Sequence, residues 1–178
     1  MTPLDIINKY YSKNSQLYTL LVNHSKSVAQ KAIEIAKNHP EMELDLKFIE
    51  EAAMLHDIGI FMCNAPDIFC TGNEPYIKHG VIGAEILRNE GLPKHALVAE
   101  RHTGSGITKE QIISGNLPIP VRDMLPITLE EKIICLADKF YSKSNPDKEK
   151  KIEKIRKSMS KHGEESLKRF DDLCSLLL

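Results

Sequence analysis

The sequence predicts an all-α protein, a compact single-domain helical bundle. Apolar residues recur every three or four positions along most of the chain, whereas the strict alternation that is typical of strands is nearly absent. Capping residues and helix breakers separate the helical stretches. The length of 178 residues, with 42% hydrophobic and 28% charged side chains, is ordinary for one soluble globular domain.

The first part of the chain contains five expected helices, each bounded by a cap or a breaker. Thr2 and Pro3 mark the start of the first, because proline is favoured at the first helical position. Asp45 caps another helix, and Gly59 is expected to end it. A helix at about 16–38 is ended by Pro40, and a helix at 78–90 is closed by Gly91. The fifth helix is expected at 93–102. A loop of about 60–75 precedes the helix at 78–90.

The second part begins with two capping boxes, in which a threonine and the residue three positions later cap a helix end reciprocally. The first box opens a short helix at Thr108, and the second opens a helix that runs from Thr128 to about Lys143. Prolines in 115–127 exclude a long regular element there. Two charged helices follow, at 148–161 and 164–178. Without a repeat or linker, one domain is expected over 1–178.

Bulk properties exclude several classes of protein. A net charge of −1 argues against general nucleic-acid binding, and no stretch approaches the roughly 18 apolar residues that a membrane span needs. The N-terminus has no secretory pattern. The four cysteines form no C-x-x-C pair, so free thiols in a reducing cytoplasm are expected; a structural zinc at Cys63 and Cys70 is the alternative. We therefore expect a cytoplasmic protein; the sequence does not predict its oligomeric state.

Several ligand-type side chains fall on the inward, apolar stripes of five expected helices. They are His24, His56, His79, His102 and Asp138. Buried imidazoles and carboxylates need partners, and a shared cation would satisfy all of them at once. Taken singly, each histidine could instead be a satisfied core residue, and Asp138 could lie on a helix surface. It is the joint occurrence that indicates a metal site.

The sharpest local feature is the run His56-Asp57-Ile58-Gly59. Two adjacent ligands at a helix end lie about 100° apart around the helix axis. They can serve one dinuclear centre if the carboxylate of Asp57 bridges two ions while the imidazole of His56 binds one of them.

The sequence resembles the HD superfamily of metal-dependent phosphohydrolases, in its HDIG branch. The motif segments are LLVNHS around His24, MLHDIG around His56 and Asp57, and CLADK around Asp138. The segments YIKHGVIGAEIL and VAERHTG, with His79 and His102, match the subgroup that has six ligands and two metals. The resemblance covers about 17–143 and leaves out the C-terminal helices at about 147–178.

This resemblance implies a helical bundle of the HD-domain type with a defined division of ligands. His24, His56, Asp57 and Asp138 would hold the first metal, and His79, His102 and the bridging Asp57 would hold the second. His56 and Asp57 would be the catalytic residues.

One position departs from the pattern. Many members of the branch have a lysine or arginine after the HDIG glycine, whereas this chain has Ile60. A substrate phosphate would therefore need another cation, and the candidates are Arg101, Lys139 and Lys78, each adjacent to a ligand. Each could also be a solvated surface residue. The charged segment 148–161 is interpreted as a solvated face because acids balance its lysines.

Imidazole and carboxylate ligands favour two divalent first-row metal ions, with iron or manganese preferred and zinc possible. The leading hypothesis is hydrolysis of a phosphoester or phosphoanhydride in a small, nucleotide-like, phosphorylated substrate by a hydroxide that bridges the two ions. The first alternative is a di-iron oxygenase acting on a small organic substrate. The second is a metal-stabilised regulatory module without turnover.

Overall fold

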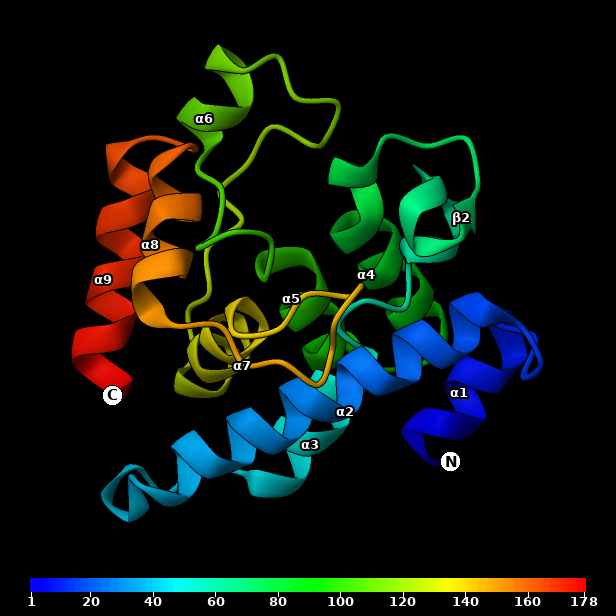
Figure 1. The fold of residues 1–178 in the computed structure, drawn as a ribbon, viewed down its shortest axis with the longest axis horizontal. Helices are drawn as coiled ribbons and strands as arrows, with labels where there is room; N and C mark the ends of the chain where they lie inside the picture. The colour runs from blue at the N-terminus through cyan, green and yellow to red at the C-terminus, as the bar shows by residue number, and fades with distance from the viewer.

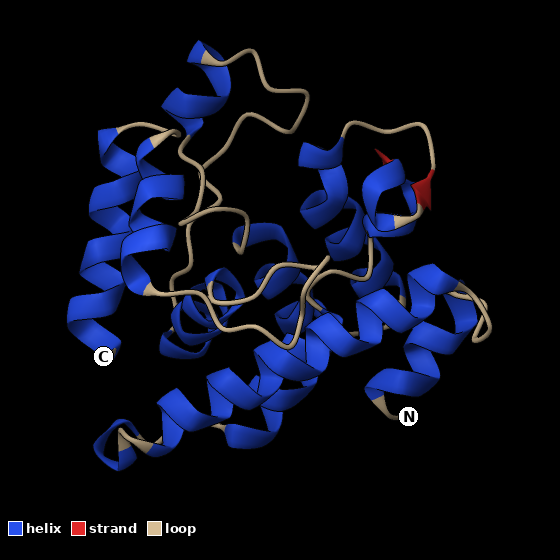
Figure 2. Cartoon of the chain, viewed as in Figure 1, coloured by secondary structure: helices blue, strands red, loops and turns tan.

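The computed structural model describes all 178 residues and is built almost entirely from helices, as Figures 1 and 2 show. The all-α prediction is confirmed. The nine α-helices are α1 (Pro3–Tyr10), α2 (Gln16–Lys37), α3 (Leu46–Leu55), α4 (His79–Asn89), α5 (Pro93–Arg101), α6 (Lys109–Ser114), α7 (Leu129–Lys139), α8 (Ile152–Ser160) and α9 (Glu164–Leu177). None of them combines the length and the apolar character that crossing a bilayer requires.

The helices pack in three groups. The long helix α2 lies along α3 and α7, α4 pairs with α5, and α8 pairs with α9 at the C-terminal side of the molecule (Figure 1). The expected loop of about 60–75 holds the only sheet, an antiparallel pair of two-residue strands, β1 (Asn64–Ala65) and β2 (Cys70–Thr71). Short 3₁₀ turns flank this pair. All four cysteines are free thiols.

Two large apolar clusters form the core. One is built from α1, the first half of α2, and α4 and α5; the other contains the second half of α2 and residues from α7, α8 and α9. Helix α3 contributes to both, because Met54 belongs to the second cluster and Leu55 to the first. The boundary between the clusters therefore crosses α2 near His24 and the end of α3 near His56.

Three helix boundaries differ from the sequence-based prediction. Helix α3 ends at Leu55 rather than Gly59, because the chain tightens there into turns in which the Ile58 amide bonds the Leu55 carbonyl. Helix α7 ends at Lys139 rather than near Lys143. Helix α8 begins at Ile152 rather than at 148, because the amide of Lys150 donates to the carbonyl of Phe140 and holds this segment extended against the end of α7.

The two threonine caps are in place, but only one box is reciprocal. Thr108 and Gln111 cap each other at the start of α6. At the start of α7 the hydroxyl of Thr128 accepts from the Glu131 amide, whereas the carboxylate of Glu131 accepts from the Ile127 amide and from Arg101. Glu131 therefore links α7 to α5 instead of closing its own cap.

Gly59 allows the end of α3 to approach the start of α4. A Cβ atom at this position would lie 2.3 Å from the carbonyl oxygen of His79 and 2.5 Å from the amide nitrogen of Gly83, both of them backbone atoms. The backbone of Gly59 has an ordinary φ of −83°, so the requirement for glycine is steric. This close approach brings His56 and Asp57 towards His79.

We predict that Gly59→Ala destabilises the protein by about 3 kcal/mol, because backbone atoms cannot move aside as a flexible side chain can. Gly83→Ala is the matched control. Its Cβ would meet neighbours at 3.4 Å or more, and alanine favours the helix, so a change within about 1 kcal/mol is expected. Urea unfolding of both variants provides the comparison; equal stabilities would contradict the steric role of Gly59.

Candidate metal centre

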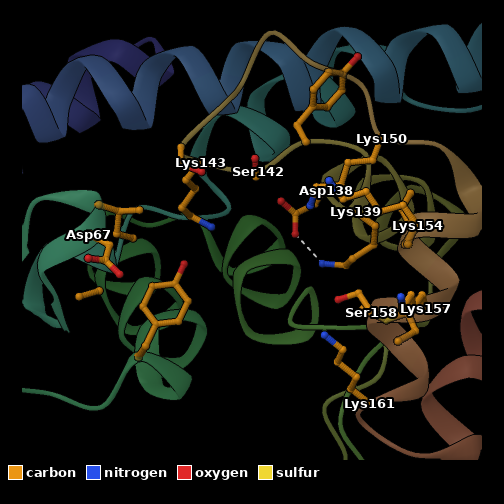
Figure 3. A pocket seen from close by; sticks show the side chains of 17 residues that line it. Asp67, Asp138, Lys139, Ser142, Lys143, Lys150, Lys154, Lys157, Ser158 and Lys161 are labelled. Carbon is orange, nitrogen blue, oxygen red and sulfur yellow. Dashed lines mark hydrogen bonds and ion pairs between the residues drawn. The ribbon is translucent and has the colours of Figure 1, made fainter.

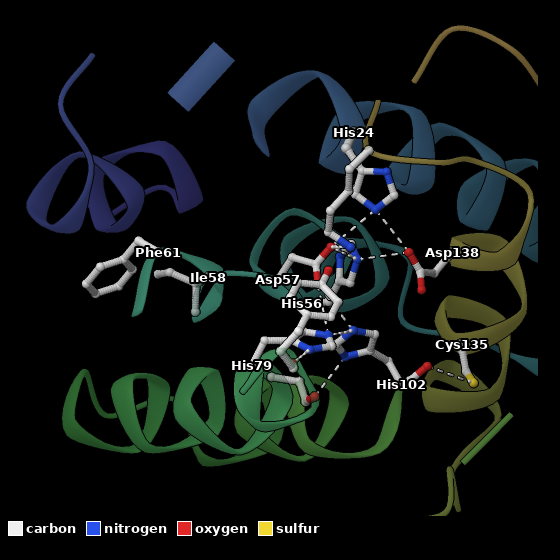
Figure 4. Close-up of polar contacts among 12 residues, drawn as sticks. His24, His56, Asp57, Ile58, Phe61, His79, His102, Cys135 and Asp138 are labelled. Atoms are coloured by element: carbon white, nitrogen blue, oxygen red, sulfur yellow. Dashed lines mark hydrogen bonds and ion pairs between the residues drawn. The ribbon is translucent and has the colours of Figure 1, made fainter. Parts of the chain in front are cut away.

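Six buried side chains from five segments point towards one centre between the two apolar clusters (Figure 4). Helix α2 supplies His24, the turn after α3 supplies His56 and Asp57, and α4 begins at His79. His102 follows the last residue of α5, and Asp138 lies in the last turn of α7. The most exposed of the six retains 9% of its surface.

Four of these residues form the first group, around one oxygen of each carboxylate. The Nε2 atom of His24 lies 3.2 Å from Oδ2 of Asp57 and 3.0 Å from Oδ1 of Asp138. The Nε2 atom of His56 lies 3.0 and 3.2 Å from the same two oxygens. All four ligand atoms lie within 4.8 Å of one another. One cation could contact all of them.

The second group uses the other oxygen of Asp57. Its Oδ1 atom lies 3.5 Å from Nε2 of His79 and 3.3 Å from Nε2 of His102, and the two imidazole nitrogens are 3.1 Å apart. Asp57 is therefore common to both groups and presents a different oxygen to each.

Three of the four histidines are oriented in the same way by the backbone. In His56, His79 and His102, Nδ1 donates to the carbonyl oxygen three residues earlier, at 2.6, 2.6 and 2.7 Å respectively. In a neutral ring this bond leaves the lone pair on Nε2, the atom that faces the centre. Hydrogen bonds of this kind commonly orient metal-binding histidines.

The buried atoms at the centre fit a divalent cation. Asp57 is completely buried, and neither of its oxygens has a hydrogen bond of regular geometry, although imidazole nitrogens lie 3.0–3.5 Å from them. A buried carboxylate destabilises the fold by several kcal/mol unless positive charge compensates it. Imidazole nitrogen and carboxylate oxygen together suit first-row divalent metals. The chain thus has a site for a divalent metal.

The two groups shift the pKa of their histidines in opposite directions. Burial lowers the pKa of His56, but Asp57 and Asp138 outweigh this effect and raise it to about 10. In the second group, burial and the neighbouring His102 lower the pKa of His79 to about 3. In the metal-free protein His56 therefore carries a proton, which a metal ion would displace, since metal binding and deprotonation are coupled.

A buried lysine adds a cation beside Asp57. The Nζ atom of Lys143 lies 2.8 Å from Oδ2 of Asp57, and only 15% of its side chain is exposed. Burial lowers the pKa of Lys143, but Asp57 and Tyr76 outweigh this and raise it above its usual value. The ring of Tyr76 lies 5.7 Å from this ammonium group and stacks on His79 at 4.5 Å.

The three cations expected from the sequence lie in different surroundings. Arg101 donates to both carboxylate oxygens of Glu131, and Lys78 lies 2.6 Å from Glu74. Lys139 is almost fully buried. Its Nζ contacts Asp138 at 2.5 Å and donates to the carbonyl of His102 at 3.0 Å, so it joins the ends of α5 and α7.

A cavity of about 810 Å³ opens beside the metal-ligand cluster (Figure 3). Asp138 of the cluster lines this cavity. Lys139, Lys143 and Tyr76, which lie next to the cluster, line it as well. Helix α8 and the residues next to it supply four more lysines, which are Lys150, Lys154, Lys157 and Lys161. Neither Arg101 nor Lys78 lines this cavity. The surroundings favour an anionic ligand.

Sequence reasoning missed Lys143 and the lysines of α8. Lys143 was expected at the end of a helix, whereas it lies in the turn after α7, and this turn lets its ammonium group reach Asp57. The solvated face predicted for 148–161 agrees with the exposure of Lys154, Lys157 and Lys161, but it gives no indication that these lysines line the cavity. The spacing of four, three and four residues among the cavity-lining lysines of this segment was the available signal, because it places them along one side of a helix.

The fold and this centre define a helical metal-binding protein with histidine and aspartate ligands. The chain belongs to the HD domain family, whose model matches residues 21–143. That segment contains all six residues of the cluster. It ends before α8 and α9.

Three relatives extend the comparison. The chain is 36% identical over 182 aligned residues to an uncharacterized protein of Methanocaldococcus jannaschii, covering 98% of this chain and 96% of the relative. It is 32% identical to a tRNA (cytidine(56)-2'-O)-methyltransferase of Thermoplasma volcanium, covering 90% of this chain and 40% of that protein. It is 34% identical to the protein of the same name from Picrophilus torridus, covering 73% of this chain and 34% of that protein. No solved structure matches the chain.

We predict that Mn²⁺ or Fe²⁺ stabilises the protein against heat and that Asp57→Asn abolishes this effect. A ligand at 100 times its dissociation constant adds about 2.7 kcal/mol, which corresponds to a shift of roughly 5–10 °C in Tm for a chain of this size. His95→Ala is the control, since His95 contacts Glu51 outside the cluster and should leave the shift intact. Unfolding should be followed by circular dichroism with and without metal; a full shift in Asp57→Asn would refute the site.

Proposed function

We propose that the protein is a metal-dependent phosphohydrolase of the HDIG branch that cleaves a phosphoester or phosphoanhydride bond in a small, nucleotide-like substrate. One observation carries this proposal: the six-residue cluster borders a cavity lined by lysines, with Asp138 common to both. A phosphorylated ligand in this cavity would bring its phosphate to the metal ligands. Membership of the HD family supports the same class of reaction.

We further propose a dinuclear centre of the six-ligand type. Asp57 supports it, because its two oxygens face two separate groups of ligands. His24, His56 and Asp138 would complete the first metal position, and His79 and His102 the second. Two divalent ions at these positions, with iron or manganese favoured and zinc possible, would activate a water nucleophile and neutralise charge on the phosphoryl group.

The residues of the chain have distinct tasks in this scheme. His56 and Asp57 are the central ligands and thus the catalytic residues. Lys143 extends from the cavity to Asp57, so its ammonium group is placed to contact a phosphoryl oxygen next to the metal ligands. Lys139 lines the same cavity and can contribute positive charge. We therefore propose Lys139 and Lys143 as substrate-binding residues. Arg101 pairs with Glu131 and Lys78 pairs with Glu74, so we do not assign substrate binding to either of them.

The cavity also bears on the alternative functions. The argument for a di-iron oxygenase was the missing cation after Gly59, and Lys143 supplies a cation beside Asp57 from another part of the chain. A purely structural metal module needs only a closed set of four ligands, whereas this cluster has six and borders a cavity. Both observations favour hydrolysis.

The methyltransferase name of two relatives applies to proteins of which this chain covers 40% and 34%. In those proteins the matching region is therefore one part of a longer chain. We assign no methyl transfer to this chain, since its centre consists of metal ligands and lysines.

We predict that the purified protein releases phosphate from members of a nucleotide panel when Mn(II) or Fe(II) is added. The double variant His56→Ala/Asp57→Ala should fall to the background rate, because both metal positions lose a ligand. His95→Ala is the control and should retain wild-type activity. The measurement is colorimetric phosphate detection, and undiminished activity in the double variant would refute the assignment. Consumption of O₂ that depends on an organic substrate, without phosphate release, would support the oxygenase instead.

The dinuclear arrangement predicts a graded loss of metal. Elemental analysis after desalting should give two ions per wild-type chain and one per chain of the His79→Ala/His102→Ala variant, since the first group remains complete. Asp57→Ala should hold less than one ion, because both positions share this carboxylate. A single ion in the wild type that persists unchanged in His79→Ala/His102→Ala would contradict the second position.

A further inference from the structure

One wall of the cavity is a row of lysines on and around α8. Lys154, Lys157 and Lys161 are separated by three and four residues and therefore lie along one side of the helix; Lys150 precedes them on the extended segment. Figure 3 shows these side chains together on one side of the cavity. Ile155 and Met159 are buried and anchor α8 to the second apolar cluster.

None of these four ammonium groups has an acidic partner. The nearby acids are engaged elsewhere, because Glu149 pairs with Lys31 at 2.6 Å and Asp171 pairs with Arg156 at 2.8 Å. Only two carboxylates, those of Asp67 and Asp138, line the whole cavity. Charge is therefore segregated within 148–161: four of its lysines line the cavity, and neither of its glutamates does.

The neighbouring positive charges affect the pKa of a lysine in the row. Burial lowers the pKa of Lys150, and although Asp138 opposes this effect, the neighbouring ammonium groups of Lys139 and Lys154 add to it. Like charges gathered in this way repel one another, and a multivalent anion would relieve the repulsion.

The opposite wall has a different chemistry. It consists of Ala65, Ile68 and Tyr76, with the single carboxylate of Asp67. Asp138 and Lys143 connect the cavity to the metal ligands. A ligand held between these walls would therefore direct its anionic groups towards α8 and its uncharged part towards Tyr76.

The volume limits the size of the ligand. A cavity of about 810 Å³ falls within the range of small-molecule and cofactor sites. It is large enough for a nucleotide with several phosphates.

We propose that α8 is the phosphate-binding wall of this site and that the ligand is a small molecule with several phosphate groups, one at the metal ligands and the others on the lysine row. The assignment of the first phosphate rests on the proposed hydrolase function. The wall itself lies at 150–161, outside the segment 21–143 that matches the family. It thus lies outside the part of the chain that the family model covers.

The test measures binding without turnover. Isothermal titration calorimetry of the metal-free protein should show that inorganic tripolyphosphate binds at least about tenfold more tightly than orthophosphate. Lys157→Ala/Lys161→Ala should weaken tripolyphosphate binding by about tenfold or more, since each lost charge-assisted contact to phosphate removes a substantial share of the affinity. Both residues are exposed, so the fold should tolerate the change.

The matched control is Lys148→Ala/Lys151→Ala. It removes two charges from the same segment, but neither residue lines the cavity. Its tripolyphosphate affinity should stay within about twofold of the wild type. An equal loss in both double variants would mean that net charge alone governs binding, and would overturn the proposal.

Two further results would also overturn it. The first is equal affinity for orthophosphate and tripolyphosphate. The second is tighter binding of a short RNA without terminal phosphates, lost in Lys157→Ala/Lys161→Ala, which would assign the wall to nucleic acid. Because no metal or catalysis enters these titrations, the proposed hydrolysis can fail while the lysine wall is supported, and hydrolysis can be found while the wall is refuted.

Discussion

The structure depends on a completely buried carboxylate that needs positive charge around it. Asp57 is completely inaccessible, and it lies where the two apolar clusters meet. Such a group destabilises a fold by several kcal/mol unless positive charge compensates it. The protonated imidazole of His56 and the ammonium group of Lys143 supply that charge when metal is absent. Metal ions held by the same side chains would supply it more completely.

Except for His24, which lies within α2, the residues of the cluster lie at or next to helix ends. The three histidines whose Nδ1 bonds a carbonyl three residues earlier stand at the end of α3, the start of α4 and the end of α5. Gly59 permits the first two of these ends to approach within backbone contact. Lys139 then joins the end of α5 to α7 through the carbonyl of His102. Backbone hydrogen bonds thus hold these three imidazoles with Nε2 directed inward.

The helices and the convergence of the six buried side chains could be predicted from the sequence, because local patterns determine them. His24 and Asp138 interrupt apolar stripes, and a stripe fixes which way a residue faces once a helix is expected. The cavity could not be predicted in this way, because it depends on the path of the chain between α7 and α8. A hydrogen bond from the Lys150 amide to the Phe140 carbonyl sets that path, and nothing local in the sequence signals it. The segregation of Glu149 towards Lys31 is equally a tertiary effect.

The position of the lysine row has a consequence for how such a site can diversify. The metal ligands all lie within 21–143, whereas the row lies on a helix that follows this segment. Ile155 and Met159 fix α8 to the second apolar cluster, so the lysines are presented by a rigid element rather than by a loop. Substitutions on the outward stripe of α8 would change the charge facing the ligand without disturbing its buried stripe or the metal ligands. The proposed metal ligands and the proposed phosphate-binding lysines therefore lie on separate elements, and Asp138, Lys139 and Lys143 lie between them.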